Sequence, residues 1–196
     1  MTATIQTTKI RTVKKKDYLT AQEVSQLLTA AGDTRYSTRD KALILLTFRH
    51  GLRATEAVSL TWEQIDLKSG RINVQRLKGS EDSIQVMEAD EVRLLKKLHA
   101  ESPDNRFVFM TERKAPMTAD GFLKLVARLG KVAGFTFKVH PHMLRHGAGH
   151  ALASANISTR TIQAMLGHKN IQHTVRYTTI SNPAFVGLGK KIGGKL

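Results

Sequence analysis

The first apolar stretch of the chain has the pattern of a capped helix. Thr20 and Glu23 stand at the spacing of a capping box, in which each side chain accepts a hydrogen bond from the other residue's backbone N–H. Leu19 and Val24 have the spacing of a hydrophobic staple around that cap. The pattern therefore predicts a helix that begins after Thr20 and ends at Gly32.

The next two elements are predicted to be helices that meet at a glycine. After Thr38, residues 42–48 are almost all apolar, which indicates a helix that is buried on most of its surface. Gly51-Leu52-Arg53 interrupts this helix, and residues 54–60 can begin another. Arg53 is thus predicted to lie at a helix junction beside a buried helix.

A β segment follows, in which apolar and polar residues alternate. Residues 71–77 alternate around Ile72 and Val74, and residues 83–87 alternate around Ile84 and Val86. Turn residues precede and separate the two runs, so the pattern predicts a hairpin with Lys78 at its tip. Residues 107–110 are predicted to form another short strand.

The remaining apolar patterns have helical spacing. Helices are expected over residues 90–100, from Thr118 as N-cap to about Gly134, from Pro141 onward, over residues 159–166, and in a short segment that opens at residues 170–171. We therefore predict a mainly α-helical fold with one small antiparallel β-sheet. Neither a repeat nor a linker divides the chain, so residues 18–180 are expected to form one domain, between a flexible arm (1–17) and a tail (181–196).

The chain carries a large excess of positive charge, which indicates a polyanionic partner. The chain holds 31 Lys+Arg against 16 Asp+Glu, a formal net charge of +15 over 196 residues. The first 16 residues, which include Lys14, Lys15 and Lys16, contribute +5, the last 16 contribute +3, and the body keeps +7. Nucleic acid is the polyanion that this balance favours. A basic soluble protein without such a partner stays an alternative.

The composition excludes several other classes of protein. The chain has no cysteine, so disulfides and thiolate metal sites are ruled out. The N-terminus carries no apolar leader, and no apolar run approaches the roughly 20 residues of a membrane span. We therefore expect a cytoplasmic protein that has no membrane partner.

The candidate chemistry gathers in residues 140–180, which hold many donors and no carboxylate. Such a site suits a negatively charged, oxygen-rich group, most simply a phosphate. His142, Arg145 and His146 stand at i, i+3 and i+4, so the helix predicted from Pro141 places them on one face. The full set of donors is His142, Arg145, His146, His150, His168, His173, Arg176 and Tyr177.

Histidines four residues apart also permit a zinc site, which is the main alternative for this helix. Arg145 would then lie among the ligands, no Asp or Glu is near, and the His-Glu-x-x-His arrangement is absent. We therefore predict no metal site, and we interpret His150 as a structural histidine. His168 directly follows Gly167, where a predicted helix ends, so its ring can turn towards a site.

Three further residues have an ordinary interpretation and a functional one. Arg53 could be a surface arginine, but Glu56 is three residues on and within reach to orient its guanidinium. Lys78 at a hairpin tip would by itself be a solvated lysine. Tyr177 could be a core phenol, or a nucleophile whose oxygen attacks phosphorus and leaves a covalent phosphotyrosine.

In order and local context, these motifs resemble the tyrosine recombinases, the phage integrase family. The matching text is Gly51-Leu52-Arg53-x-x-Glu56, then His142-x-Leu144-Arg145-His146, then Leu166-Gly167-His168 followed by Thr174 and Tyr177. The resemblance covers residues 18–180, and the wording HPHMLRH, HTVRYT and QRLKG is most similar to the small recombinases that invert the fimbrial promoter switch of enteric bacteria. Most members carry a separate helical N-terminal domain that clamps the other face of the DNA, and residues 1–17 are too short for one.

The resemblance implies how a scissile phosphate would be held. Arg53 and Arg145 would grip its non-bridging oxygens, because two guanidinium forks neutralise the charge that builds as phosphorus becomes five-coordinate. His168 would donate to the same oxygens, and Glu56 would orient the site. The basic arm and Arg176 would contact the DNA.

The resemblance also implies a covalent mechanism that needs no cofactor. Tyr177 would attack phosphorus and form a 3′-phosphotyrosyl link, and His142 would assist in proton handling. Lys78 would act as the general acid that protonates the departing 5′-oxygen. Because the tyrosyl link stores the phosphodiester energy, rejoining would require neither ATP nor a metal ion.

The implied function is site-specific DNA recombination, with inversion of a short element favoured over integration or excision. The implied partners are double-stranded DNA with specific sites, four protomers on two sites, and accessory DNA-bending proteins in a bacterial nucleoid. The tail from Ser181 could dock on a neighbouring protomer. Two alternatives stay open: a type IB topoisomerase that relaxes supercoiled DNA, and a non-catalytic DNA-binding regulator with the same fold.

Overall fold

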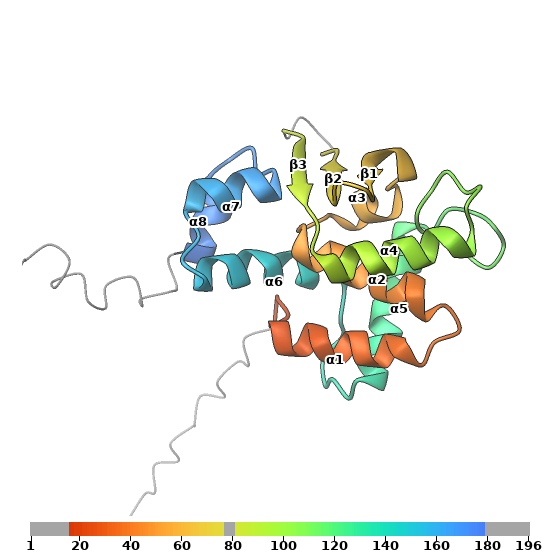
Figure 1. Cartoon of the computed structure of the whole chain (residues 1–196). Helices are drawn as coiled ribbons and strands as arrows, with labels where there is room; N and C mark the ends of the chain where they lie inside the picture. Colours follow the sequence, from red (N-terminus) through yellow and green to blue (C-terminus); the bar gives the residue numbers. More distant parts are fainter. Residues whose placement is uncertain (1–15, 77–80, 179–196) are drawn as a thin grey trace, which may run out of the picture.

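The structure, a computed structural model, describes residues 16–76 and 81–178, which fold mainly into helices (Figure 1). The helices are α1 (Ala21–Gly32), α2 (Ser37–Arg49), α3 (Ala54–Val58), α4 (Ala89–Glu101), α5 (Ala119–Val132), α6 (Pro141–Ser154), α7 (Thr159–Leu166) and α8 (Gln172–Thr178), with a 3-10 turn η1 (Trp62–Gln64). The predicted mainly α-helical class is confirmed. Lys14, Lys15, Lys78 and the tail lie outside the described residues.

The predicted helix starts and stops follow from local hydrogen bonds. The Glu23 backbone N–H donates to the Thr20 hydroxyl at 3.3 Å, and the Thr20 N–H donates to the Glu23 carboxylate at 2.9 Å, so α1 begins with the predicted capping box. Thr118 caps α5 in the same manner, with its hydroxyl 3.0 Å from the backbone nitrogen of Gly121. Pro141 is the first residue of α6. The third helix, α3, is Ala54–Val58 and begins where the sequence predicted a helix to begin.

The small sheet contains the predicted hairpin and one additional strand. Strands β1 (Ile65–Asp66), β2 (Arg71–Val74) and β3 (Ser83–Val86) are antiparallel in the order β1-β2-β3. Ile72 and Val74 point into the core, whereas Ile84 and Val86 are each 71% exposed. In the observed register Ile84 pairs with Asn73, on the outer face, which leaves the polar Gln85 to point inward.

The strand predicted over residues 107–110 is not formed as a ladder, and that prediction was wrong. Phe107 makes an isolated bridge to Thr61, and Met110 makes another to Pro116. Directly after Thr61 the chain turns into η1, so no second residue of that segment can continue the pairing. The segment is extended but lacks a partner strand of sufficient length.

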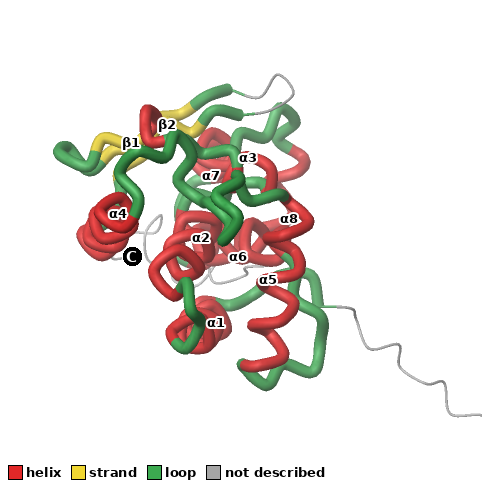
Figure 2. The backbone as a smooth tube through the Cα atoms, turned by 90° about the vertical axis from the view of Figure 1, so that its right-hand side faces the viewer, coloured by secondary structure: helices red, strands yellow, loops and turns green. Residues whose placement is uncertain are grey.

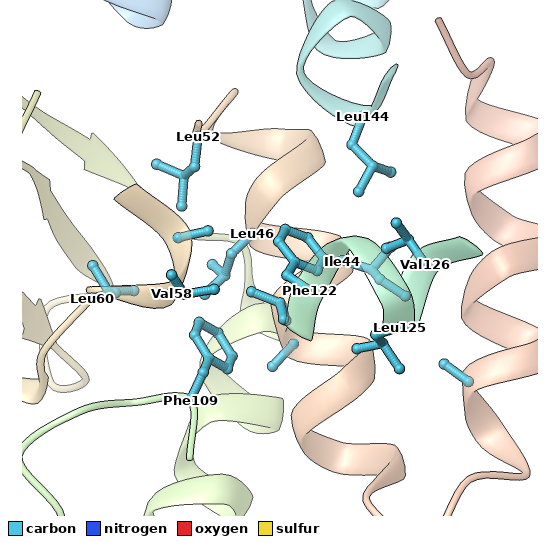
Figure 3. Close-up of a cluster of buried hydrophobic side chains, with 14 of the residues drawn as sticks. Ile44, Leu46, Leu52, Val58, Leu60, Phe109, Phe122, Leu125, Val126 and Leu144 are labelled. Carbon is cyan, nitrogen blue, oxygen red and sulfur yellow. The ribbon is translucent and has the colours of Figure 1, made fainter. Parts of the chain in front are cut away.

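Side chains from several helices share the main core, which Figure 3 shows in close-up. Ile44 and Leu46 of α2 lie beside Phe122 and Val126 of α5, and Leu144 of α6 reaches the same cluster. Burial of one such side chain contributes about 1.5–3 kcal/mol, so this cluster holds the helical body together.

The C-terminal helices have a second, smaller apolar cluster of their own. It consists of Ala148, Ala153, Ile162, Leu166 and Tyr177, with Leu152 packed against it. α6 contacts α2 and α8, while α7 contacts α6, α8 and β3. Figure 1 shows α7 and α8 together at one end of α6, and Figure 2 shows the same helices turned by 90°. This packing brings the end of α2, the end of α7 and the hairpin to one place. In the described part, no helix is both long and apolar enough to cross a membrane.

Candidate active site

The corner between α2 and α3 positions Arg53. Gly51 has φ of +57°, and a Cβ atom there would lie 2.2 Å from the Leu166 Cδ2 atom, so both the turn and the close approach of α7 require glycine. Arg53 is the N-cap residue of α3, and its backbone N–H donates to the Glu56 carboxylate at 2.8 Å. Its guanidinium donates to the other oxygen of Glu56 at 2.5 Å. The structure therefore brings Arg53 and Glu56 together as predicted.

Glu56 is a buried carboxylate among three guanidinium groups. Its side chain is 2% exposed, and its oxygens lie 2.5 Å from Arg53, 2.7 Å from Arg76 and 3.9 Å from Arg145. Burial alone would raise the pKa of Glu56, but the Arg53 N–H and the Arg76 charge outweigh it and lower that pKa. One negative charge thus faces three positive charges, and the cluster keeps an excess of positive charge.

Arg145 lies on the buried face of α6, where it joins two segments. Its guanidinium donates to the Gly51 carbonyl and, at 2.7 Å, to the Leu166 carbonyl at the end of α7. Burial, and then repulsion from Arg53 and Arg76, lower the pKa of Arg145 to about 10. Arg145 therefore remains protonated at neutral pH and adds its charge to the site.

Arg76 is part of this cluster, and the sequence interpretation did not single it out. Its side chain is 0% exposed, and its guanidinium donates to Glu56 at 2.7 Å and to the carbonyls of His50, Gly51 and Met165. A usable signal was present in the alternation of β2. Ile72 and Val74 point inward, and two residues further the same period places Arg76 on the inner face.

His168 occupies the position that the predicted helix break suggested. Gly167 ends α7 in the left-handed conformation, with φ of +62°, and the chain then turns so that the His168 ring faces α8. The Nδ1 atom of His168 lies 2.8 Å from the hydroxyl oxygen of buried Thr174. This contact orients the ring and leaves Nε2 as the nitrogen for a ligand.

Tyr177 is buried between α8 and α6 and is 2% exposed. A Cβ atom on Gly149 would lie 2.7 Å from the Tyr177 ring, so this glycine makes room for the phenol. The His168 ring stacks on Tyr177 at a centroid distance of 6.3 Å. Arg176 donates to the Tyr177 oxygen at 3.1 Å and contacts His146 at 2.5 Å. Its predicted contact with DNA stays a prediction.

The histidines of α6 share one face, as their spacing predicted. The rings of His142 and His146 are 4.1 Å apart, and His150 stacks on Tyr18 at 3.9 Å. His150 also lies edge-on to the Tyr177 ring at a centroid distance of 5.0 Å, and its predicted structural role stays a prediction. In the described ranges, no three His, Asp or Glu residues are arranged to hold a metal ion.

Of the four lysines predicted to act at the site or to contact DNA, only Lys16 lies within the described residues. Lys16 lies 2.5 Å from Glu23 and 5.0 Å from the centroid of the Phe137 ring, so it is attached to the domain. Lys14, Lys15 and Lys78 belong to the segments outside the described residues. Their roles as DNA contacts and general acid stay predictions.

We expect the free protein to lose stability as the pH falls below about 6.5. Burial, followed by the charges of neighbouring groups, lowers the pKa of His146 and of His168 to about 3. Between these folded values and the unfolded value near 6.5, the unfolded chain binds more protons than the folded chain, so acid favours unfolding. At pH 5, each histidine lowers the free energy of unfolding by on the order of 1–2 kcal/mol relative to neutral pH.

Urea denaturation at pH 7 and at pH 5 measures this effect. The midpoint should fall with the pH, and His146→Gln should reduce the fall, because glutamine does not titrate. Equal midpoints for the parent chain at the two pH values would contradict the prediction.

Comparisons with known proteins agree with this geometry. The model of the phage integrase family matches residues 17–182. The type 1 fimbriae regulatory protein FimB of Escherichia coli strain K12 is 38% identical over 190 residues, which cover 93% of this chain and 94% of FimB. The tyrosine recombinase XerC of Lactobacillus leichmannii is 30% identical over 183 residues, covering 88% of this chain and 62% of XerC.

A solved structure extends the similarity to the fold. The crystal structure of XerA recombinase has a TM-score of 0.75 at 28% identity, over 91% of this chain and 66% of the XerA chain. Residues 17–182, which the family model matches, include every described element that carries Arg53, Glu56, Arg145, His168 or Tyr177. The chain therefore belongs to the phage integrase family and is a tyrosine recombinase.

Proposed function

We propose that this chain cleaves and rejoins double-stranded DNA at specific sites, with Tyr177 as the nucleophile. The observation that carries the proposal is the pair of Arg53 and Arg145 at the buried carboxylate of Glu56, together with His168, whose ring stacks on Tyr177. These residues come from α3, α6, α8 and the turn after α7. Their excess positive charge is what a phosphodiester anion requires.

In the proposed site, the two guanidinium groups hold the scissile phosphate. The Arg53 side chain is 34% exposed, so its guanidinium can reach DNA. The Arg145 side chain is buried and adds a second positive charge to the phosphate site. The Nε2 atom of His168 would donate to the same non-bridging oxygens. A bound phosphate anion would favour the protonated form of His168, opposite to the effect of the neighbouring arginines in the free chain.

The proposed chemical step exchanges one phosphoester for another. The bond between the Tyr177 oxygen and phosphorus forms as the bond from phosphorus to the 5′-oxygen breaks. The phenolic proton leaves with the help of His142, and Lys78 protonates the departing oxygen. Attack by a 5′-hydroxyl on the phosphotyrosyl link reverses the step, so joining uses no cofactor.

Tyr177 is buried in the free chain, and we propose that α8 shifts to bring its oxygen to a phosphate. The small C-terminal cluster offers little apolar contact to oppose such a shift. DNA binding would therefore select the exposed position of the nucleophile.

We further propose that the reaction is inversion of a short DNA element, rather than integration or excision. The support is the similarity to FimB over nearly the full length of both proteins. Paired recombination sites, four protomers on two sites, accessory DNA-bending proteins and a place in the bacterial nucleoid belong to the same proposal, as does docking of the tail on a neighbouring protomer.

A plasmid assay tests the proposal. The DNA that flanks the gene is cloned into a supercoiled plasmid, and the orientation of its segments is read by restriction digestion after incubation with the protein. We expect inversion between repeats in this plasmid, and no relaxation of a plasmid without them. Relaxation of both plasmids would favour a type IB topoisomerase, and binding without cleavage would favour a DNA-binding regulator.

A further inference from the structure

The buried guanidinium of Arg76 makes several hydrogen bonds besides its ion pair with Glu56. Its NH1 atom donates to Glu56 at 2.7 Å and to the Gly51 carbonyl at 3.3 Å. Its NH2 atom donates to the His50 carbonyl at 3.2 Å and to the Met165 carbonyl. These acceptors belong to the α2–α3 corner, α3 and the end of α7, and the donor itself follows β2.

Burying this guanidinium costs free energy that an apolar side chain would not cost. Burial lowers the pKa of Arg76, and the charge of Glu56 opposes that shift. The Nε atom is buried and lacks a hydrogen-bond partner. An apolar residue at such a place is often as stabilising as a buried ion pair, so stability alone gives no reason for an arginine here. The reason for an arginine is that its planar guanidinium can donate to acceptors on separate segments at the same time.

Glycine at position 167 makes this contact possible. A Cβ atom on Gly167 would lie 2.9 Å from the Cγ atom of Arg76, so the stem of the arginine packs directly against the turn that carries His168. On the other side, Glu56 joins Arg76 to Arg53. Arg76 therefore contacts both Glu56, which pairs with Arg53, and the Gly167 turn, which carries His168.

We propose that Arg76 is a positioning residue, which sets the distance between Arg53 and His168 and ties both to the hairpin that leads to Lys78. The inference rests on the proposed function of this site. Arg76 does not touch the DNA: it acts through Glu56 on Arg53, and through the end of α7 on His168. A displacement of about 1 Å at a reacting group can lower a rate about 10²-fold, so the loss of this fork affects the chemical step.

Gln85 provides a second, weaker link between the same hairpin and α7. Its Nε2 atom donates to the Met165 carbonyl at 3.1 Å, and its Oε1 atom lies 2.8 Å from the Nδ1 atom of His50. It has no contact with Glu56 or Gly51 among its hydrogen bonds in the described residues. Gln85 thus contacts two of the segments that Arg76 contacts, the α2–α3 corner and the end of α7, but not Glu56, which separates the two effects experimentally.

The test compares Arg76→Lys with Arg39→Lys. Lysine keeps the charge but cannot span the separate acceptors. Arg39 is a matched control at the opposite end of α2: it is 13% exposed, pairs with Asp40 at 2.7 Å and donates to the Met110 carbonyl at 2.9 Å. For each variant, we measure the thermal midpoint, the Kd for site DNA, and the single-turnover rate of covalent adduct formation at saturating DNA.

For Arg76→Lys we expect a Kd within about twofold of the parent and an adduct rate lowered about 10²-fold. For Arg39→Lys we expect a similar fall in the thermal midpoint, with both the Kd and the rate retained. An Arg76→Lys rate within about threefold of the parent, or an equal rate loss in Arg39→Lys, would overturn the proposal.

Two further arms keep the test decisive. If Arg76→Lys does not fold, Gln85→Met removes the second link to α7 and the contact to His50 while it leaves the pairs of Glu56 intact, and we expect a smaller rate loss with an unchanged Kd. An unchanged rate in Gln85→Met would then count against positioning through α7 and the α2–α3 corner. A parent chain that forms no adduct would instead refute the proposed function, so the two failures are distinguishable.

Discussion

Tyr177→Phe is expected to abolish covalent attachment to DNA while leaving the protein folded and bound to its site. The phenyl ring keeps its place against Gly149 and His168, and only the contact between Arg176 and the phenol oxygen is lost. Loss of such a hydrogen bond costs about 0.5–1.5 kcal/mol, so the fold survives. Without the phenol oxygen, no bond to phosphorus can form.

A suicide substrate provides the measurement, because a nick beside the scissile phosphate lets the departing strand diffuse away. The adduct is then counted on a denaturing gel. Tyr18→Phe is the matched control: Tyr18 stacks on His150 close to the site, and this variant also loses only an oxygen. We expect full adduct formation by Tyr18→Phe. An adduct that persists in Tyr177→Phe would remove Tyr177 from the mechanism.

Glu56→Ala is expected to have the largest effect on stability. The substitution leaves Arg76 and Arg145 buried without their carboxylate, next to Arg53. Removal of one partner from a buried ion pair costs about 3–5 kcal/mol, because the remaining charge stays desolvated. Glu112→Ala serves as the control, since the pair between Glu112 and Arg35 is largely exposed and surface pairs contribute about 0–1 kcal/mol.

The pH dependence of this difference checks its origin. The pKa of Glu56 is lowered in the folded chain, so its ionised form stabilises the fold above the ordinary pKa of a glutamate. That contribution is lost as the pH falls through the lowered folded value. The free energy of unfolding of Glu56→Ala should therefore approach that of the parent in acid. A difference between the two proteins that does not change with pH would show that packing, rather than charge, is responsible.

Local patterns were sufficient to predict most of the helices and the hairpin. The capping box at Thr20, the prolyl start of α6 and the glycine end of α7 are decided by neighbouring residues, which is why their sequence signals were reliable. The strand predicted over residues 107–110 failed for the opposite reason. A strand needs a partner, and the segment beside it turns away after Thr61.

The sequence by itself determined which side chains share a helix face and which types of group are present. It predicted the common face of His142 and Arg145, the turn before His168, and a cluster of donors suited to phosphate, because these depend on spacing within single elements. Only the tertiary structure decided that Glu56 serves three arginines, that Arg76 is among them, and that Tyr177 is buried in the free chain. Such contacts join segments far apart in the sequence. They are set by how helices pack against one another and against the hairpin, and no local period encodes that packing.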